Sequence, residues 1–204
     1  MHPLNKDVVL VGVSERTSVA ALDEISELLF DRGFSDMIAV ILPESSPAIH
    51  LDMVWTQVDR ELCVAYPPMF RGTVRAPILH RRKGQHVVTE PNTLFAALAE
   101  VGIKMEPIWA GGPRLETQER EQWGSGCNFL AVAPGQVLSY ARNEATLEAM
   151  QGAGFRIVNG ESLLLGDDTL EEDERGVITF SAAELVRGGG GPRCMSCPVL
   201  RDEI

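Results

Sequence analysis

The sequence predicts a mixed α/β fold, and three observations support this class. Short apolar runs with strand character alternate with segments whose apolar residues recur at helical spacing. The first such unit is a buried strand at residues 7–13, a helix at 18–32 and a second strand at 37–42. Prolines then end several strands, as Pro43 and the pair Pro67–Pro68 do. Hydrophobic residues make up 45% of the 204-residue chain, which suffices for one large domain or a piece of a larger protein.

The other elements are expected in the same alternating order. Leu22, Ile25 and Leu29 give the first helix its apolar face, and Gly33 follows its end. Further strands are predicted at 61–66, 103–109, 155–158 and 177–180, with a hairpin of 128–133 and 137–141 around Pro134–Gly135 and helices at 93–101 (capped by Asn92 or Thr93) and 144–152. The remaining stretches are predicted as a β-rich region at 71–90 with a solvated turn at 81–83, a polar loop at 111–126, an acidic surface insertion at 160–176, a helical turn at 181–186 and a last strand at 195–200.

Composition restricts the class of partner and the compartment. The formal net charge of −11 makes nucleic acid and anionic membranes poor partners. No apolar run approaches the roughly 18 residues of a transmembrane helix, and the N-terminus lacks the features of a signal peptide. The four cysteines are therefore expected to be free thiols of a cytoplasmic protein.

The stretch 187–198, RGGGGPRCMSCP, is the most informative in the chain. Glycines let a backbone approach a ligand closely, and a cysteine beside backbone N–H groups and a cation can act as a thiolate nucleophile. The functional hypothesis is a nucleophilic Cys194 on a tight glycine loop. The alternative is a flexible linker before a buried strand, with Cys194 as a small hydrophobic residue. Both interpretations remain open on this stretch alone.

Two further segments carry candidate site residues. His50 and Asp52 flank Leu51, and in a strand such i, i+2 residues face the same side. They could present an imidazole and a carboxylate to one ligand, although a polar pair at a strand end is the more frequent explanation of so short a motif. Arg16 follows the first strand and could hold a carboxylate through its guanidinium. A surface arginine is the simpler interpretation of Arg16 taken alone.

A metal site and a disulfide-exchange site are both disfavoured. Cys194 and Cys197 form C-x-x-C, but a strand is predicted after them where a redox motif needs a helix. A zinc site would need a second ligand pair, and the close histidines His80 and His86 fall in a predicted exposed turn. Cys197 is therefore expected to be a packing residue.

Four segments together resemble the C-terminal half of the arginine deiminase family. They are SERTS (14–18), HLDMVWTQVD (50–59), REQWGSGCNFLAVAPGQVLSYARN (120–143) and RGGGGPRCMSCPVLRD (187–202). They occur in the family's order, and the resemblance extends over nearly the whole chain. It favours the nucleophile hypothesis for Cys194 over the packing alternative.

The resemblance implies a pentein fold, a fan of five ββαβ-type blades, of which this chain would form about three. It implies hydrolysis of L-arginine to L-citrulline and ammonia through a cysteine-bound thiouronium intermediate, with no metal or cofactor. Cys194 then matches the nucleophile and His50 the general acid and base. Asp52 matches a ligand of the guanidinium, Arg16 the partner of the substrate carboxylate, and Gly188 a backbone carbonyl that contacts the substrate.

The chain departs from the family pattern in two places. A second guanidinium-binding Asp and a Glu, which the family carries ahead of residues 7–13, are absent, so we expect residues 1–204 to be the C-terminal portion of the catalytic domain. The missing half could come from another chain or a homo-oligomer. Gly189 also stands where some members carry a gating arginine. The alternatives are a non-catalytic pentein remnant that acts as a binding module, and a related enzyme of the amidinotransferase or dimethylarginine hydrolase type.

Overall fold

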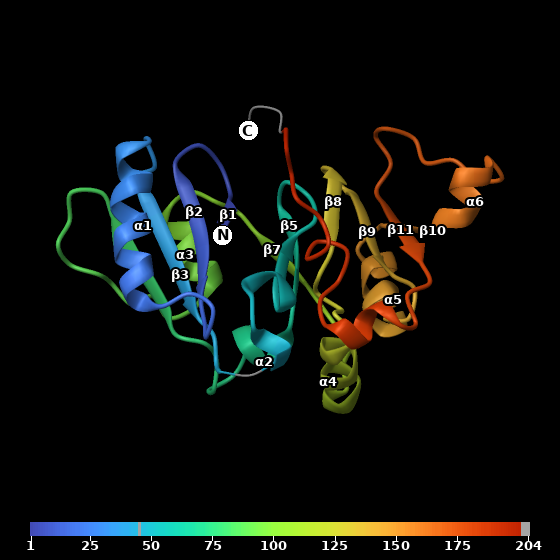
Figure 1. The fold of residues 1–204 in the computed structure, drawn as a ribbon, viewed down its shortest axis with the longest axis horizontal. Helices are drawn as coiled ribbons and strands as arrows, with labels where there is room; N and C mark the ends of the chain where they lie inside the picture. The colour runs from blue at the N-terminus through green and yellow to red at the C-terminus, as the bar shows by residue number, and fades with distance from the viewer. Residues whose placement is uncertain (45, 201–204) are drawn as a thin grey trace. The chain divides into compact units, whose positions relative to one another are not determined.

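The protein is described by a computed structural model that covers residues 1–44 and 46–200 (Figure 1). Its chain divides into two compact units. The first comprises Met1–Leu51 and Pro68–Met105 with Leu200, and the second comprises Asp52–Pro67 and Glu106–Val199. The chain thus passes from the first unit to the second between two of the predicted site residues, His50 and Asp52.

The first unit is built on a four-stranded sheet of order β1-β2-β3-β6. Its strands are β1 (His2–Pro3), β2 (Val8–Val13), β3 (Asp36–Ile41) and β6 (Ile78–Arg82). β2 and β3 are parallel, with Val8 opposite Asp36, and β1 and β6 pair antiparallel at the two edges. Parallel neighbours require a crossover connection, and α1 (Val19–Asp31) provides it, as the sequence predicts.

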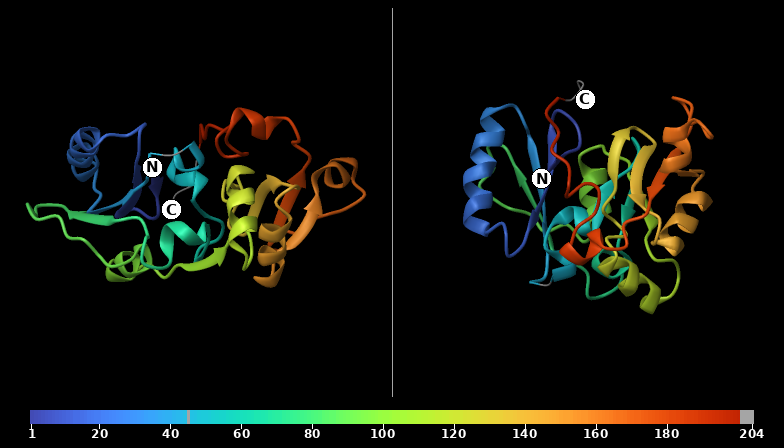
Figure 2. Two further views of the ribbon diagram at one scale, coloured as in Figure 1. Left: turned by 90° about the horizontal axis from the view of Figure 1, so that it is seen from below. Right: turned by 45° about the vertical axis from the view of Figure 1, so that its right-hand side comes forward.

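The ends of α1 and α3 follow from their capping residues. The Ser18 side chain accepts a hydrogen bond from Ala21 N (3.1 Å) and begins α1. Leu22 and Phe30 on α1 pack into one buried cluster with residues of β2 and β3, and Figure 2 shows α1 along one face of this sheet. Thr93 in the same way accepts from Ala96 N (3.0 Å) and begins α3 (Leu94–Glu100). The short elements η1 (Ser46–Ala48) and α2 (Pro67–Phe70) lie in the connections.

The second unit contains two further sheets. The three-stranded sheet has the order β4-β5-β7, from β4 (Trp55–Gln57), β5 (Leu62–Ala65) and β7 (Glu106–Trp109). The four-stranded sheet has the order β10-β11-β9-β8, from β8 (Leu130–Ala133), β9 (Gln136–Tyr140), β10 (Arg156–Asn159) and β11 (Gly176–Phe180). The helices are α4 (Leu115–Trp123), α5 (Glu144–Gly152) and α6 (Gly160–Leu165), with 3₁₀ turns η2 (Leu51–Met53) at the unit boundary and η3 (Leu185–Gly188).

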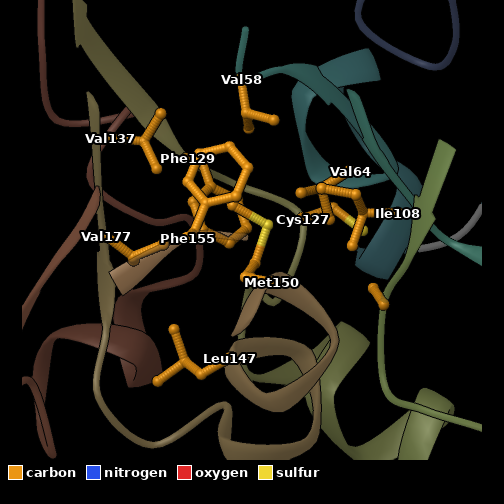
Figure 3. Close-up of a cluster of buried hydrophobic side chains, with 11 residues drawn as sticks. Val58, Val64, Ile108, Cys127, Phe129, Val137, Leu147, Met150, Phe155 and Val177 are labelled. Atoms are coloured by element: carbon orange, nitrogen blue, oxygen red, sulfur yellow. The ribbon is translucent and has the colours of Figure 1, made fainter. Parts of the chain in front are cut away.

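The core of the second unit lies between its two sheets and α5. Figure 3 shows Cys127 among Phe129, Phe155 and Met150, which are all almost fully buried. Burial raises the pKa of the Cys127 thiol well above its ordinary value, so this cysteine packs as a small hydrophobic residue. Apolar packing therefore supports the segment that leads from α4 into β8.

A hairpin, a helix and a further strand recur three times in chain order. The three sets are β1-β2-α1-β3, β4-β5-α3-β7 and β8-β9-α5-β10, although α2 and β6 lie between β5 and α3 in the second set and α3 belongs to the first unit. In each set the first two strands pair antiparallel, and the last strand runs parallel to the second, with β11 inserted between β9 and β10 in the third set. The result is a mixed α/β fold with three small mixed sheets, which confirms the predicted class.

The prediction of a polar loop at 111–126 is wrong, because α4 occupies Leu115–Trp123. This helix has no continuous apolar stripe, so hydrophobic periodicity could not find it. Polar contacts hold it instead: buried Glu121 accepts hydrogen bonds from Ala145 N and Thr146 N of α5, both at 2.9 Å. Tertiary hydrogen bonds thus stabilise a helix that the local sequence pattern does not predict.

The prediction of a last strand at 195–200 is also wrong. Within the described residues, this segment pairs with none of the sheets. The chain turns instead, with Met195 N donating to Gly191 O (3.3 Å) and Ser196 N to Arg193 O (3.1 Å). Val199 is 96% exposed, so the apolar run has no sheet against which to pack.

The region 71–90 contains the predicted β-structure in β6, but its basic residues and histidines are not all in an exposed turn. His80 lies in β6, is 1% exposed, and its Nε2 is 2.7 Å from Asp36 Oδ1. Arg81 is also part of β6 and pairs with Asp23 of α1 at 3.0 Å. Because side chains alternate between the two faces of β6, His80 of the histidine pair points into the core.

Candidate active site

Asp52 and Cys194, two of the predicted site residues, lie together in the second unit. Asp52 is in η2 and Cys194 is in the turn that follows the glycine run. Asp52 Oδ1 is 3.8 Å from Cys194 Sγ, and Asp52 Oδ2 is 3.5 Å from Arg193 Nε. A carboxylate, a guanidinium and a thiol therefore converge from two segments that are 142 residues apart in the chain.

The segment of His50 and Asp52 is not a strand, which corrects the predicted reason for their pairing. Leu51–Met53 forms the 3₁₀ turn η2, and the strand β4 begins only at Trp55. With three residues per turn, residues i and i+2 of such a helix point in different directions. His50 precedes η2 and is exposed, whereas Asp52 is half-buried.

Asn128 organises the Cys194 turn, and the sequence reasoning did not single it out. Its side chain is fully buried at the start of the segment that leads into β8. Its Oδ1 accepts from Arg193 N (3.1 Å) and Cys194 N (3.2 Å), and its Nδ2 is 3.1 Å from Cys194 Sγ. An amide side chain between the apolar residues Cys127 and Phe129 was the available signal, because buried polar groups need partners.

The glycine run brings the backbone close to this amide. A Cβ on Gly191 would lie 2.7 Å from Asn128 Oδ1 and 2.9 Å from Asn128 O, so a side chain has no room there. Gly190 has φ +84°, and its carbonyl accepts a hydrogen bond from Tyr140 Oη (3.3 Å). Gly188 ends η3 and is exposed, with open space at its Cα. In this run the backbone therefore requires glycine at positions 189 (φ +79°) and 190 through their positive φ and at position 191 through lack of space, whereas Gly188 is under neither constraint.

Opposing influences act on the Cys194 thiol. Partial burial raises its pKa above the ordinary value of 9.0, and the negative charge of Asp52 raises it further. Hydrogen bonds from Gly191 N and Asn128 act in the opposite direction and lower it. The net direction of the pKa shift is upward, which favours the protonated thiol over the thiolate.

Cys194 and Cys197 are exposed, whereas Cys63 and Cys127 are buried. The expectation that Cys197 is a packing residue is therefore wrong. Desolvation raises the pKa of Cys63 as well as that of Cys127, which leaves both thiols protonated. Only the two cysteines of the C-terminal turn are open to reagents among the four.

Arg16 and His50 belong to the first unit, where one hydroxyl links their two segments. Ser14 Oγ donates to Ile49 O (2.8 Å) and accepts from Arg16 N (3.1 Å). Arg16 itself is exposed, and its Nε is 3.4 Å from Glu15. Ser14 is the first residue of the SERTS motif. Its hydroxyl therefore fixes the backbone next to both predicted site residues, Arg16 and His50.

The described residues contain no group of three or more histidine, cysteine or acidic side chains arranged to hold a metal ion. None of the described helices combines the length and apolar character needed to cross a bilayer. The chemistry available in the Cys194 turn is that of a thiol held by an amide beside a carboxylate.

The family model for arginine deiminase matches residues 1–201. The chain belongs to the arginine deiminase family. Its relatives named arginine deiminase include those of Mycoplasma capricolum subsp. capricolum (33% identical over 205 residues), Listeria welshimeri serovar 6b (33% over 207) and Streptococcus agalactiae serotype Ia (32% over 206). Each match covers 98% of this chain but only 45–46% of the relative. This member of the family therefore spans less than half the length of the curated relatives it matches.

A solved structure supports the fold of this arginine deiminase family chain. It is the apo crystal structure of ArgZ, described as an arginine dihydrolase from the ornithine-ammonia cycle in cyanobacteria. The match has a TM-score of 0.53 at 14% identity and covers 95% of this chain and 23% of ArgZ. At this identity the likeness concerns the fold alone.

Proposed function

We propose that this chain carries the C-terminal part of an arginine-hydrolysing active site, which converts L-arginine and water to L-citrulline and ammonia. The observation that supports this most directly is the approach of Asp52 Oδ1 to Cys194 Sγ at 3.8 Å, in a chain of the arginine deiminase family. A guanidinium held by the carboxylate would have its central carbon beside the sulfur, where the thiolate can attack.

The proposed reaction has two steps. The Cys194 thiolate forms a bond to the guanidinium carbon, the bond from that carbon to a terminal nitrogen breaks, and ammonia leaves with a proton from His50. His50 then takes a proton from water, the hydroxide adds to the thiouronium carbon, and the carbon–sulfur bond breaks to release citrulline. General acid–base help of this kind contributes about 10²–10⁴ in rate. Arg16 is proposed to bind the substrate carboxylate, and the Gly188 carbonyl to accept from the substrate.

The raised pKa of Cys194 bears on how the thiolate arises. A cationic guanidinium bound beside the sulfur and Asp52 would compensate the negative charge that disfavours ionisation. Substrate binding would therefore promote deprotonation of its own nucleophile. The raised pKa of Cys194 also favours a requirement for further active-site groups. These groups would lie in the part of the family's sequence that this chain lacks, and another chain or a homo-oligomer would supply them.

For the fold, we propose that the three hairpin–helix–strand sets are three ββαβ blades of a five-bladed pentein. Residues 1–204 would then be the C-terminal portion of the catalytic domain, with the acidic segment 160–176 as a surface insertion. This segment begins with α6, and Arg156 binds its carboxylates Asp168 (3.0 Å) and Glu174 (2.6 Å).

The test is citrulline formation by the purified chain, alone and with a supplied N-terminal half of a relative. We expect turnover in at least the reconstituted sample, and its loss in Cys194→Ser while Cys197→Ser retains it. A covalent adduct on Cys194 in single-turnover mass spectrometry would identify the nucleophile. Absence of citrulline in both samples, with arginine binding retained, would favour the alternative of a non-catalytic binding module. Turnover of methylated arginines but not arginine would indicate a related guanidine-modifying enzyme instead.

A further inference from the structure

The side-chain amide of Asn128 uses all of its hydrogen-bonding capacity around Cys194. An amide side chain offers two N–H donors and two lone pairs on oxygen. Both lone pairs are occupied by Arg193 N (3.1 Å) and Cys194 N (3.2 Å). The two donors face Asp52 O (3.2 Å) and Cys194 Sγ (3.1 Å), with a longer contact to Met53 Sδ (3.8 Å).

These contacts determine which end of the amide faces the sulfur. Two backbone N–H groups can be satisfied only by an oxygen, and the carbonyl of Asp52 only by a donor. Rotating the amide by 180° would set donors against donors and leave a buried carbonyl unpaired, which is costly. The NH₂ group of Asn128 is therefore obliged to point at Cys194 Sγ, in a site where the asparagine is 0% exposed.

A donor in this position distinguishes the two protonation states of the sulfur. A neutral thiol is a weak acceptor, whereas a thiolate makes a short, strong charge-assisted bond. The other polar groups that bear on the sulfur are Asp52, which opposes ionisation, the backbone of Gly191, whose hydrogen bond favours it, and Tyr140, whose own pKa is raised by burial and then by Cys194. The neighbouring Arg193 pairs with Asp52. Asn128 supplies the side-chain amide donor to the sulfur in this set.

We propose that Asn128 is a further catalytic residue, whose amide fixes the Cys194 turn through two backbone N–H groups and donates a hydrogen bond to the attacking thiolate. This inference rests on the proposed role of Cys194 as nucleophile. The close approach of Gly191 to Asn128 contributes to the same arrangement, because the missing side chain allows the turn to wrap around the amide.

The test measures the thiol directly and does not require arginine turnover. In a Cys197→Ser background, Cys194 is the remaining exposed cysteine. Its rate of alkylation by iodoacetamide is followed by mass spectrometry between pH 6 and 10. Asn128→Asp keeps an oxygen for the two backbone N–H groups but replaces the donor with an acceptor. Asn128→Ala removes the donor without adding charge, and Asn159→Asp on the exposed N-cap of α6 is the matched control.

We expect both Asn128 variants to shift the alkylation profile to higher pH by about one unit or more, roughly a tenfold loss of reactive thiolate at neutral pH. Asn159→Asp should leave it unchanged. Circular dichroism and thermal melting report whether the variants fold. If they do not, the side-chain ¹⁵N–¹H signals of Asn128 in the unmodified chain should titrate with the Cys194 thiol, and should not titrate in Cys194→Ser.

An unchanged alkylation profile in folded Asn128→Ala, or amide signals that ignore the thiol, would overturn the inference. Citrulline formation together with an unchanged profile would leave the proposed function standing without this residue. A shifted profile in a chain that forms no citrulline would retain the role of Asn128 toward the sulfur and count against arginine hydrolysis.

Discussion

Asp52 Oδ1 lies 3.8 Å from Cys194 Sγ, so the carboxylate proposed to bind the substrate also restrains the proposed nucleophile. Its negative charge raises the pKa of the thiol, after the larger effect of burial. Ionisation of the sulfur and occupation of the carboxylate by a cation are therefore coupled through one short distance.

Replacing Asp52 by asparagine should make the Cys194 thiol more reactive toward alkylation but should decrease citrulline formation. Loss of the negative charge lowers the pKa of the thiol, so alkylation at pH 7 should become faster, by about tenfold or less. Citrulline formation should fall, because the proposed guanidinium ligand is lost. Asp59→Asn is the control, since the Asp59 carboxylate pairs with Arg175 at 2.7 Å and is not among the causes of the Cys194 shift. Slower alkylation in Asp52→Asn would contradict the sign argued here.

Gly191→Ala should disturb the Cys194 turn by steric conflict alone. The new Cβ would lie 2.7–2.9 Å from three atoms of Asn128, two of which are its backbone oxygen and its Cβ. We expect a loss of about 1–3 kcal/mol in the free energy of unfolding, measured in urea, and altered alkylation of Cys194. Gly152→Ala on α5 meets nothing within 4 Å and should be neutral or stabilising. Equal behaviour of the two variants would show that the turn adapts.

Glu121→Ala should destabilise the second unit strongly. Glu121 is 2% exposed and accepts from Ala145 N, Thr146 N and Thr146 Oγ1 (2.7 Å), so its loss leaves buried donors of α5 unpaired. We expect a decrease of about 2–4 kcal/mol in the free energy of unfolding. Glu121→Gln retains one acceptor oxygen and should lose less. Glu148→Gln, on the exposed side of α5, should stay within about 0.5 kcal/mol of the unmodified chain.

The contribution of Arg156 to stability should disappear in acid. Hydrogen bonds from Arg156 lower the pKa of Asp168 below 3.8 and that of Glu174 below 4.5, their ordinary values. A lowered pKa in the folded state stabilises above the ordinary value, and this stabilisation is lost as the pH falls through the lowered one. The urea midpoints of the unmodified chain and Arg156→Gln should therefore differ at pH 7 and converge as the pH falls through the lowered pKa values.

Salt and a second arginine provide the controls for this prediction. Arg156 and its two carboxylate partners are partly solvent-exposed, so 0.5 M NaCl should reduce the difference at pH 7. Arg187→Gln should change the midpoint less at either pH, because Arg187 and its single carboxylate partner Glu184 are both more exposed than the Arg156 pairs. A difference that grows in acid would refute the assignment.

Local patterns in the sequence were sufficient for most elements and for the identity of the nucleophile candidate. The strand at β2, the capped helices α1 and α3, the β8–β9 hairpin and α5 follow from apolar spacing and capping residues that act within a few positions. α4 could not be predicted in this way, because hydrogen bonds to distant residues hold it. The C-terminal turn could not be predicted either, because no strand among the described residues pairs with it. Asn128 was missed because the partners of its side chain are all distant in sequence, at residues 52–53 and 193–194.

What the chain alone determined is the set of reactive groups: a cysteine after four glycines, a histidine and an aspartate two residues apart, and an arginine after the first strand. These depend only on covalent order and residue chemistry. Tertiary structure decided that Asp52 meets Cys194 from 142 residues away, that η2 rather than a strand presents it, and that an unforeseen amide faces the sulfur. Such contacts form only when the fold buries polar groups together, because a buried donor or acceptor must find its partner wherever the chain places one.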